Sequence, residues 1–226
     1  MNKRTIGAIL VILILIIVIW IGAAAIRRNN SHNNNDLQES SQSLSDNNVD
    51  NEIDEFIKEQ DSIMHSMMSD MGSLEYSGSA DIDYLMGMIP HHKSAVEMAE
   101  SYLKYGGEND NMKALAENII TTQNEEIDLM NNMLKSIKSE NTGDETSRMY
   151  TEEYVNMMEH SHSHSVNYDS IDKIFAGGMS EHHQMAVDMS EIILKYSKNE
   201  EVKKLAENII ETQKKEIEEM NNFLNS

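Results

Sequence analysis

Hydrophobic residues recur at helical spacing over most of the chain, with polar residues between them. One apolar stripe runs from Met88 to Leu103 and takes in a pair of adjacent histidines. A second stripe begins at Leu115, ends at Ile137 and carries Glu126 near its middle. This period of about 3.6 residues predicts amphipathic α-helices and an all-α fold.

Both stripes occur twice. The segment MIPHHKSAVEMAESYLKY (88–105) matches MSEHHQMAVDMSEIILKY (179–196), and KALAENIITTQNEEIDLMNNML (113–134) matches KKLAENIIETQKKEIEEMNNFL (203–224), with about half of the aligned positions identical. One two-helix hairpin cannot cover both of its own stripes, so we expect the two copies to complete a bundle of four long helices. We expect shorter Met-rich helices, at about 50–71 and 147–160, to pack onto it.

The N-terminus carries an uncharged apolar run of 21 residues, Ile6 to Ile26. Such a run can cross a hydrocarbon core about 30 Å thick as a helix. Lys3 and Arg4 before it also fit a cleaved signal peptide, but the length of the run and Arg27 directly behind it favour an uncleaved anchor. We therefore predict a single-pass protein of the cell membrane whose C-terminal part is extracytoplasmic.

Composition narrows the chemistry. The chain has 39 acidic and 18 basic residues, a net charge of −21, so it repels phosphate backbones and nucleic-acid binding is excluded. There is no cysteine, hence no disulfide and no thiolate ligand. A bound metal must therefore use His, Met or carboxamide and carboxylate oxygens. The 18 methionines are several times the usual share and require a cause.

The histidine pairs are the clearest candidate chemistry. Each pair lies on its apolar stripe with one methionine before it and another after it, and Pro90 before the first pair suits a helix start or a kink. A helix N-terminus would keep the imidazoles neutral, which is the form that binds metal. Thioether and imidazole together favour Cu(I). Glu126 and Met130 on one facing helix, and Glu216 and Met220 on the other, would complete or orient the two sites.

Structural explanations compete with this interpretation. Methionine on a helical stripe is ordinarily core filler, a buried His pair is more often hydrogen-bonded structure than ligand, and Glu126 could pair with a lysine. The recurrence of the whole set in both copies favours metal binding, because a buried carboxylate is costly unless it is paired or faces a metal.

A second histidine group is weaker. His160, His162 and His164 alternate with serines, and His65 lies at a similar place in the first copy. Such a tract can hold Cu(II), Ni(II) or Zn(II) loosely, or it can be a polar loop between helices. No catalytic motif was found: Glu-x-x-His is absent from the long helices, and no nucleophile elbow, phosphate loop or zincin motif occurs. We therefore expect no enzyme.

GMIPHHKSAVEMA (87–99) and GMSEHHQMAVDMS (178–190) resemble the signature of a bacterial and archaeal family, domain of unknown function 305, in two tandem copies. The resemblance covers about 50–226 and implies a ferritin-like helical fold. Some members, the CopM-like periplasmic proteins, bind copper and contribute to copper resistance. On matching positions it implies metal ligands at Met88, His91, His92 and Met98 and at Met179, His182, His183 and Met189. The second copy has Ser180-Glu181 in place of Ile-Pro, so the two sites need not be equivalent.

Together these features predict four parts: an anchor or signal peptide (1–28), a disordered linker (29–50) and two helical metal-binding units (51–140 and 141–226). The expected function is extracytoplasmic copper binding, for sequestration or for handover to a delivery or efflux partner. Cu(I) is favoured over Cu(II), Ag(I) or Zn(II). The alternatives are a metal-independent structural or interaction module with a Met-rich core, and a copper-dependent redox enzyme.

Overall fold

The computed structural model describes residues 40–137, 145–160 and 170–226, and these residues form six α-helices without a strand. The all-α fold is therefore confirmed for the described part of the chain. The helices are α2 (Ser40–Gly72), α3 (Ala80–Tyr105), α4 (Asp110–Ser136), α5 (Glu145–His160), α6 (Ile171–Tyr196) and α7 (Glu200–Leu224).

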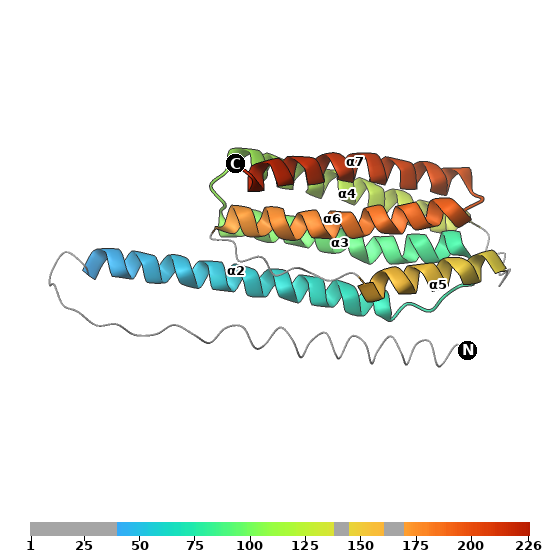
Figure 1. The fold of residues 1–226 in the computed structure, drawn as a ribbon, viewed down its shortest axis with the longest axis horizontal. Coiled ribbons are helices and arrows are strands. Elements are labelled where there is room, and N and C mark those ends of the chain that lie inside the picture. The colour runs from blue at the N-terminus through green and yellow to red at the C-terminus, as the bar shows by residue number, and fades with distance from the viewer. Residues whose placement is uncertain (1–39, 138–144, 161–169) are drawn as a thin grey trace.

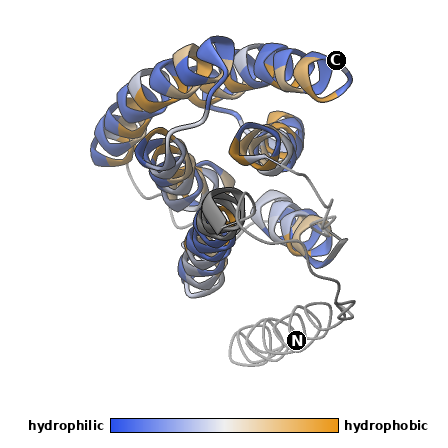
Figure 2. Cartoon of the chain, turned by 90° about the vertical axis from the view of Figure 1, so that its left-hand side faces the viewer, coloured by the Kyte–Doolittle hydropathy of each residue, from blue (hydrophilic) through white to orange (hydrophobic). Residues whose placement is uncertain are grey.

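Four long helices form two hairpins, α3 with α4 and α6 with α7, and the hairpins meet mainly through α3 and α6 (Figure 1). Helix α2 packs along α3, and the shorter α5 packs on α6 and α3. In Figure 2 hydrophobic and hydrophilic stretches alternate along the helix that ends at the C-terminus, as expected for an amphipathic helix. The expected four long helices with two added Met-rich helices are thus present.

Short capped loops make the hairpins. Gly106 ends α3 with a φ of 73°, a left-handed conformation that glycine adopts without a Cβ penalty. The side chain of Asn109 then accepts hydrogen bonds from the backbone of Asn111 and Met112 at the start of α4. Asn199 caps α7 in the same way.

The axes of α3 and α6 run antiparallel, as their buried residues show. One apolar cluster joins the first part of α3, around Met88, to the last part of α6, around Met189. A second cluster joins the last part of α3, around Met98, to the first part of α6, around Met179. Between the two clusters lies a buried belt, here called the polar layer, that consists of His91, His92, Gln123, Glu126, His182, His183, Gln213 and Glu216.

A buried carboxylate joins the two hairpins at one end. Asp172, in the first turn of α6, accepts hydrogen bonds from the hydroxyl of Tyr102 (2.6 Å) and from the backbone of Glu108 and Asn109. Burial alone would raise the pKa of Asp172, but these hydrogen bonds hold it below the ordinary value. Gly107 leaves room for this contact, because a Cβ there would lie 2.5 Å from the carboxylate.

The structure differs from two expectations drawn from the sequence. Pro90 does not begin a helix: α3 starts ten residues earlier, at Ala80, and Pro90 lies inside it. The residues before Pro90 continue the helix because they pack in the first apolar cluster, and that packing outweighs the lost backbone hydrogen bond. Helix α2 begins at Ser40, inside the segment 29–50 expected to be a linker.

The expected anchor, Ile6 to Ile26, lies outside the described residues. Among the helices of the described residues, none has the length and apolar character needed to cross a membrane.

One buried polar pair distinguishes the two halves. The hydroxyls of Tyr84 and Ser190 lie 2.8 Å apart, and both residues are fully buried. The repeat places Phe175 and Ala99 at the equivalent positions of the other half. Polar residues thus face each other near one end of the α3–α6 interface, and apolar residues occupy the equivalent positions near the other end.

Tyr84→Phe and Ser190→Ala should each lower the free energy of unfolding by about 1–3 kcal/mol, because each leaves one buried hydroxyl without a partner. The double variant recreates the Phe175 and Ala99 pair and should cost less than the sum of the two. Urea unfolding of the four proteins in a double-mutant cycle measures this. Strictly additive losses would show that the two hydroxyls do not depend on each other.

Candidate metal centre

Four histidines meet at the centre of the bundle, two from each half. All four side chains are fully buried. The rings of His91 and His182 contact each other across the α3–α6 interface, with centroids 3.9 Å apart and planes tilted by 44°. His92 and His183 flank them, each 6.2 Å from its neighbour in sequence. The duplication thus produces one four-imidazole cluster rather than two separate pairs.

Each outer histidine is held by a carboxylate from the second helix of its own hairpin. Nε2 of His92 lies 2.9 Å from Glu126, and Nε2 of His183 lies 2.8 Å from Glu216. The facing stripes predicted this pairing. Because a carboxylate accepts hydrogen bonds, the ring proton of a neutral imidazole is on Nε2. The lone pair is then on Nδ1, which has no hydrogen-bond partner in either ring.

His182 is held differently, by Ser94 of the other half. The Ser94 hydroxyl donates its single proton to the carbonyl of His91 (2.6 Å) and lies 2.7 Å from Nε2 of His182. Nε2 of His182 therefore donates to Ser94, and its lone pair is on Nδ1. That atom too is buried without a hydrogen-bond partner.

His91 is the least constrained of the four, since neither of its ring nitrogens makes a hydrogen bond of good geometry. Burial, followed by the neighbouring rings of His182, His92 and His183, lowers its pKa well below 6.5, and the nearby carbonyl of His182 offsets only a small part. Burial and the rings of His183 and His92 likewise lower the pKa of His182. The sequence suggested that a helix N-terminus keeps the imidazoles neutral. In the structure the neutral state of His91 and His182 comes mainly from desolvation instead.

The candidate thioethers are distributed between the halves. Met88 and Met130 of the first half share an apolar cluster with Met189 of the second. Met179 and Met220 of the second half share the other cluster with Met98 of the first. Close contacts support this exchange, because a Cβ on Gly87 would lie 3.5 Å from the Met189 methyl group and one on Gly178 would lie 3.7 Å from that of Met98. The methionines before and after one His pair thus lie on opposite sides of the polar layer.

Two glutamines add unused polar atoms. Gln123 and Gln213 are each 2% exposed, and neither amide group has a hydrogen-bond partner. Their positions match in the repeat, three residues before Glu126 and Glu216. The candidates drawn from the sequence did not include Gln213 or Ser94, although the repeat alignment was a signal for Gln213. Buried polar groups without partners are rare in proteins, so this layer is suited to a guest that supplies the missing contacts.

The polar layer approaches the surface on the α4–α7 side. An open groove of about 390 Å³ lies there, lined by Thr122, Glu125, Glu126, Leu129, Leu205, Asn208, Glu211 and Thr212. Glu126 belongs both to this groove and to the His92 pair, and its side chain is 15% exposed. Glu216 is only 8% exposed and also accepts a hydrogen bond from Asn118. The first half is therefore the more open one.

One further histidine with a described side chain, His65, is not part of this cluster. His65 is exposed on α2. His160 is the last residue of α5, and His162 and His164 lie outside the described residues. In the described ranges, no three carboxylate or imidazole side chains gather closely enough to hold a metal ion by themselves.

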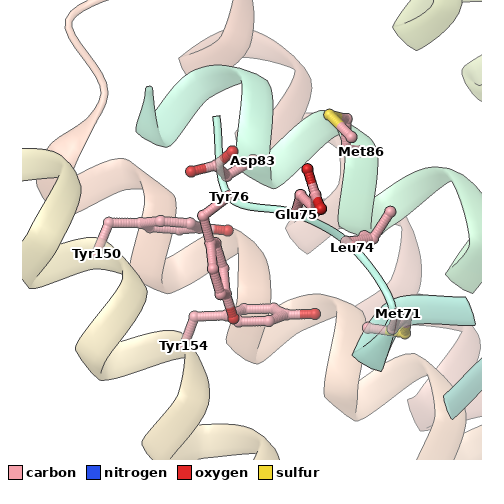
Figure 3. Close-up of a pocket in the computed structure, with 8 residues that line it drawn as sticks. All are labelled: Met71, Leu74, Glu75, Tyr76, Asp83, Met86, Tyr150 and Tyr154. Atoms are coloured by element: carbon pink, nitrogen blue, oxygen red, sulfur yellow. The ribbon is translucent and has the colours of Figure 1, made fainter. Parts of the chain in front are cut away.

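A second cavity, of about 10 Å³, lies between α5, the end of α2 and the start of α3 (Figure 3). Tyr76, Tyr150 and Tyr154 line it together with Asp83, and the hydroxyls of Tyr150 and Tyr154 have no hydrogen-bond partner. Burial and the Asp83 carboxylate raise the pKa of Tyr76 to about 12. The cavity has room for a single water molecule, so it is no organic ligand site.

Sequence comparison places the chain in a family. Residues 22–134 and 172–226, about three quarters of the chain, match the family described as "Domain of unknown function (DUF305)". The chain belongs to this family. A curated relative, "Uncharacterized protein L153" of Acanthamoeba polyphaga mimivirus, is 45% identical over 53 residues, which are 24% of this chain and 35% of that protein. The chain thus spans about a third of the length of that relative.

The solved structures similar to this chain include two of CopM and one of a DUF305 fragment. "CopM in the Ag-bound form (by soaking)" and "CopM in the Cu(II)-bound form" are 28% and 27% identical, each with a TM-score of 0.48, over 64% of this chain and 95% of CopM. A DUF305 fragment from Deinococcus radiodurans is 25% identical with a TM-score of 0.47, over 65% and 95% of the two chains. At these TM-scores the similarity does not bear on what this chain binds.

Acidification should destabilise the metal-free protein. Because the pKa values of His91 and His182 are lower in the folded state, the stability is full above about 6.5, the unfolded-state value, and falls below it. The loss approaches about 1.4 kcal/mol per pH unit for each ring until its folded-state pKa is reached. Denaturant unfolding between about pH 5 and 7.5 measures the slope.

In His91→Gln the slope of the unfolding free energy with pH should fall by the contribution of about one proton. His65→Gln, an exposed control, should keep the wild-type slope. An unchanged slope in His91→Gln would show that His91 does not contribute to the acid sensitivity.

Proposed function

We propose that this protein binds copper as Cu(I), in a centre built from the four-histidine cluster and the thioethers beside it. The observation that carries the proposal is a fully buried set of four imidazoles whose Nδ1 atoms lack hydrogen-bond partners. In a purely structural core such atoms would be satisfied, because a buried polar group without a partner costs about 1–3 kcal/mol. An ion can supply the missing bonds.

The donor set favours a soft ion. Imidazole and thioether are the available ligands, and thiolate is absent from the sequence. Soft thioethers select Cu(I) and, by the same chemistry, Ag(I). Glu126 and Glu216 hold their histidines with Nδ1 as the lone-pair atom, the orienting role that outer carboxylates play in metal sites.

The proposed role is that of a carrier rather than an enzyme. The four histidines are fully buried inside the bundle, and the sequence carries no catalytic motif. Together with the predicted anchor at Ile6–Ile26, this supports a tethered extracytoplasmic protein that sequesters copper or hands it to a delivery or efflux partner. The net charge of −21 would concentrate cations at its surface.

A competition titration tests the proposal. Under anaerobic, reducing conditions the wild-type protein should bind Cu(I) or Ag(I) in preference to Zn(II), because thioethers are poor zinc ligands. Isothermal titration with each ion, alone and in competition, gives the order of affinities. Absence of binding would favour the metal-independent structural module, and turnover of the bound copper would favour a redox enzyme.

Glu126→Gln should weaken binding by about 10–100-fold, as loss of an outer-shell carboxylate does elsewhere. The charge is lost while the shape of the side chain is kept. Glu125→Gln is the matched control: it lines the same groove but makes no contact with a histidine in the polar layer. Equal affinities for Glu126→Gln and wild type would assign Glu126 to the fold alone.

Glu216→Gln should weaken binding less than Glu126→Gln. Glu181 precedes the His pair of the second half and offers a second carboxylate, and this half is the more enclosed one. Titration of the two single variants side by side measures the difference. A larger loss in Glu216→Gln would reverse the proposed order of the two halves.

A further inference from the structure

The two halves of the bundle are related by a pseudo-twofold axis that passes between His91 and His182. Reciprocal contacts demonstrate it: each outer histidine pairs with its own glutamate. Each half also sends one methionine methyl group to a glycine of the other half. A contact seen in one half therefore locates the equivalent side chain of the other.

One substitution breaks this symmetry beside the central rings. Ser94, three residues after His91, contacts His182 across the interface. Its equivalent in the repeat is Met185, three residues after His182. The pseudo-twofold axis therefore directs the side chain of Met185 from α6 toward His91. Met185 is 8% exposed and belongs to the apolar cluster that holds Met88, Met130 and Met189.

The surroundings of His182 and His91 differ in the hydrogen bonds and ligands that they offer. At His182, the Ser94 hydroxyl occupies Nε2, because its own proton goes to the carbonyl of His91. At His91 neither nitrogen has a hydrogen-bond partner of good geometry, and the neighbouring position carries a thioether, which is a soft ligand. His91 is thus open to an ion on the side where His182 is closed.

We propose that Met185 is a metal ligand, and that it joins His91 in binding the first soft monovalent cation that enters the cluster. The half with Ser94 and His182 fills second and more weakly. This assignment rests on the proposed function. It adds a residue outside the duplicated motif, since the position equivalent to Met185 in the first copy is a serine.

Reciprocal substitutions test the assignment, with Ag(I) alone as the probe. Met185→Leu keeps the volume of the side chain and should preserve the fold. It should weaken the tighter Ag(I) binding step by about tenfold or more, at least as much as the loss of an outer-shell partner. Ser94→Met should raise the affinity of the weaker Ag(I) binding step until it approaches that of the tighter step. Ser94→Ala removes the hydroxyl from His182 without adding sulfur, so it should not raise this affinity.

Met112→Leu is the matched control, because Met112 is also buried but belongs to the other apolar cluster. It should leave both Ag(I) binding steps at their wild-type values. A second readout follows the ring signals of histidine by NMR: the first equivalent of Ag(I) should shift the His91 signals before those of His182.

The outcomes separate this inference from the proposed function. If wild-type protein binds no Ag(I) and no Cu(I), the copper proposal fails and this assignment with it. If wild type binds Ag(I) but Met185→Leu binds it equally well, or the His182 signals shift first, only the role of Met185 is overturned. Circular dichroism of each variant establishes that the helices are intact before titration.

Discussion

Burial of four imidazoles is the constraint on which the rest of this bundle depends. Apolar side chains pack in almost any axial register, but buried polar groups are costly without partners. The contact of His91 with His182, and the reach of Ser94 across the interface, therefore hold α3 and α6 at one register. The two apolar clusters lie on either side of this layer because the sequence puts the histidines in the middle of both helices.

The same layer explains why the domain is duplicated. A single hairpin can pair His92 with Glu126, but it leaves the other ring of its His pair exposed along an uncovered stripe. A second copy, turned about an axis between the two hairpins, places His182 against His91 and covers both. Once two copies share one core, each position is free to diverge as long as its partner across the axis accommodates the change. The pair Tyr84 and Ser190 shows such an accommodation.

The charge of the protein and the shape of the layer suit a cation that travels from the surface inward. Most of the excess acidic charge lies on exposed helix faces. The groove between α4 and α7 is lined by Glu125, Glu126 and Glu211. Glu126 connects the two regions, since it lines the groove and also contacts His92. An ion would thus meet oxygen ligands first and nitrogen and sulfur ligands deeper in, an order that favours retention of soft ions over hard ones.

Local pattern determined a large part of this protein. The helical period and the repeat were enough to predict four long helices and the pairing of Glu126 with the His pair. Each depends on residues close in sequence or on facing stripes joined by a short loop. The tertiary structure alone decided that Pro90 lies within a helix, that Met98 packs with the opposite half, and that Ser94 holds His182. A stripe defines a face of a helix but not its axial register against a partner, and it is the register of two antiparallel helices that brings side chains of separate halves into one site.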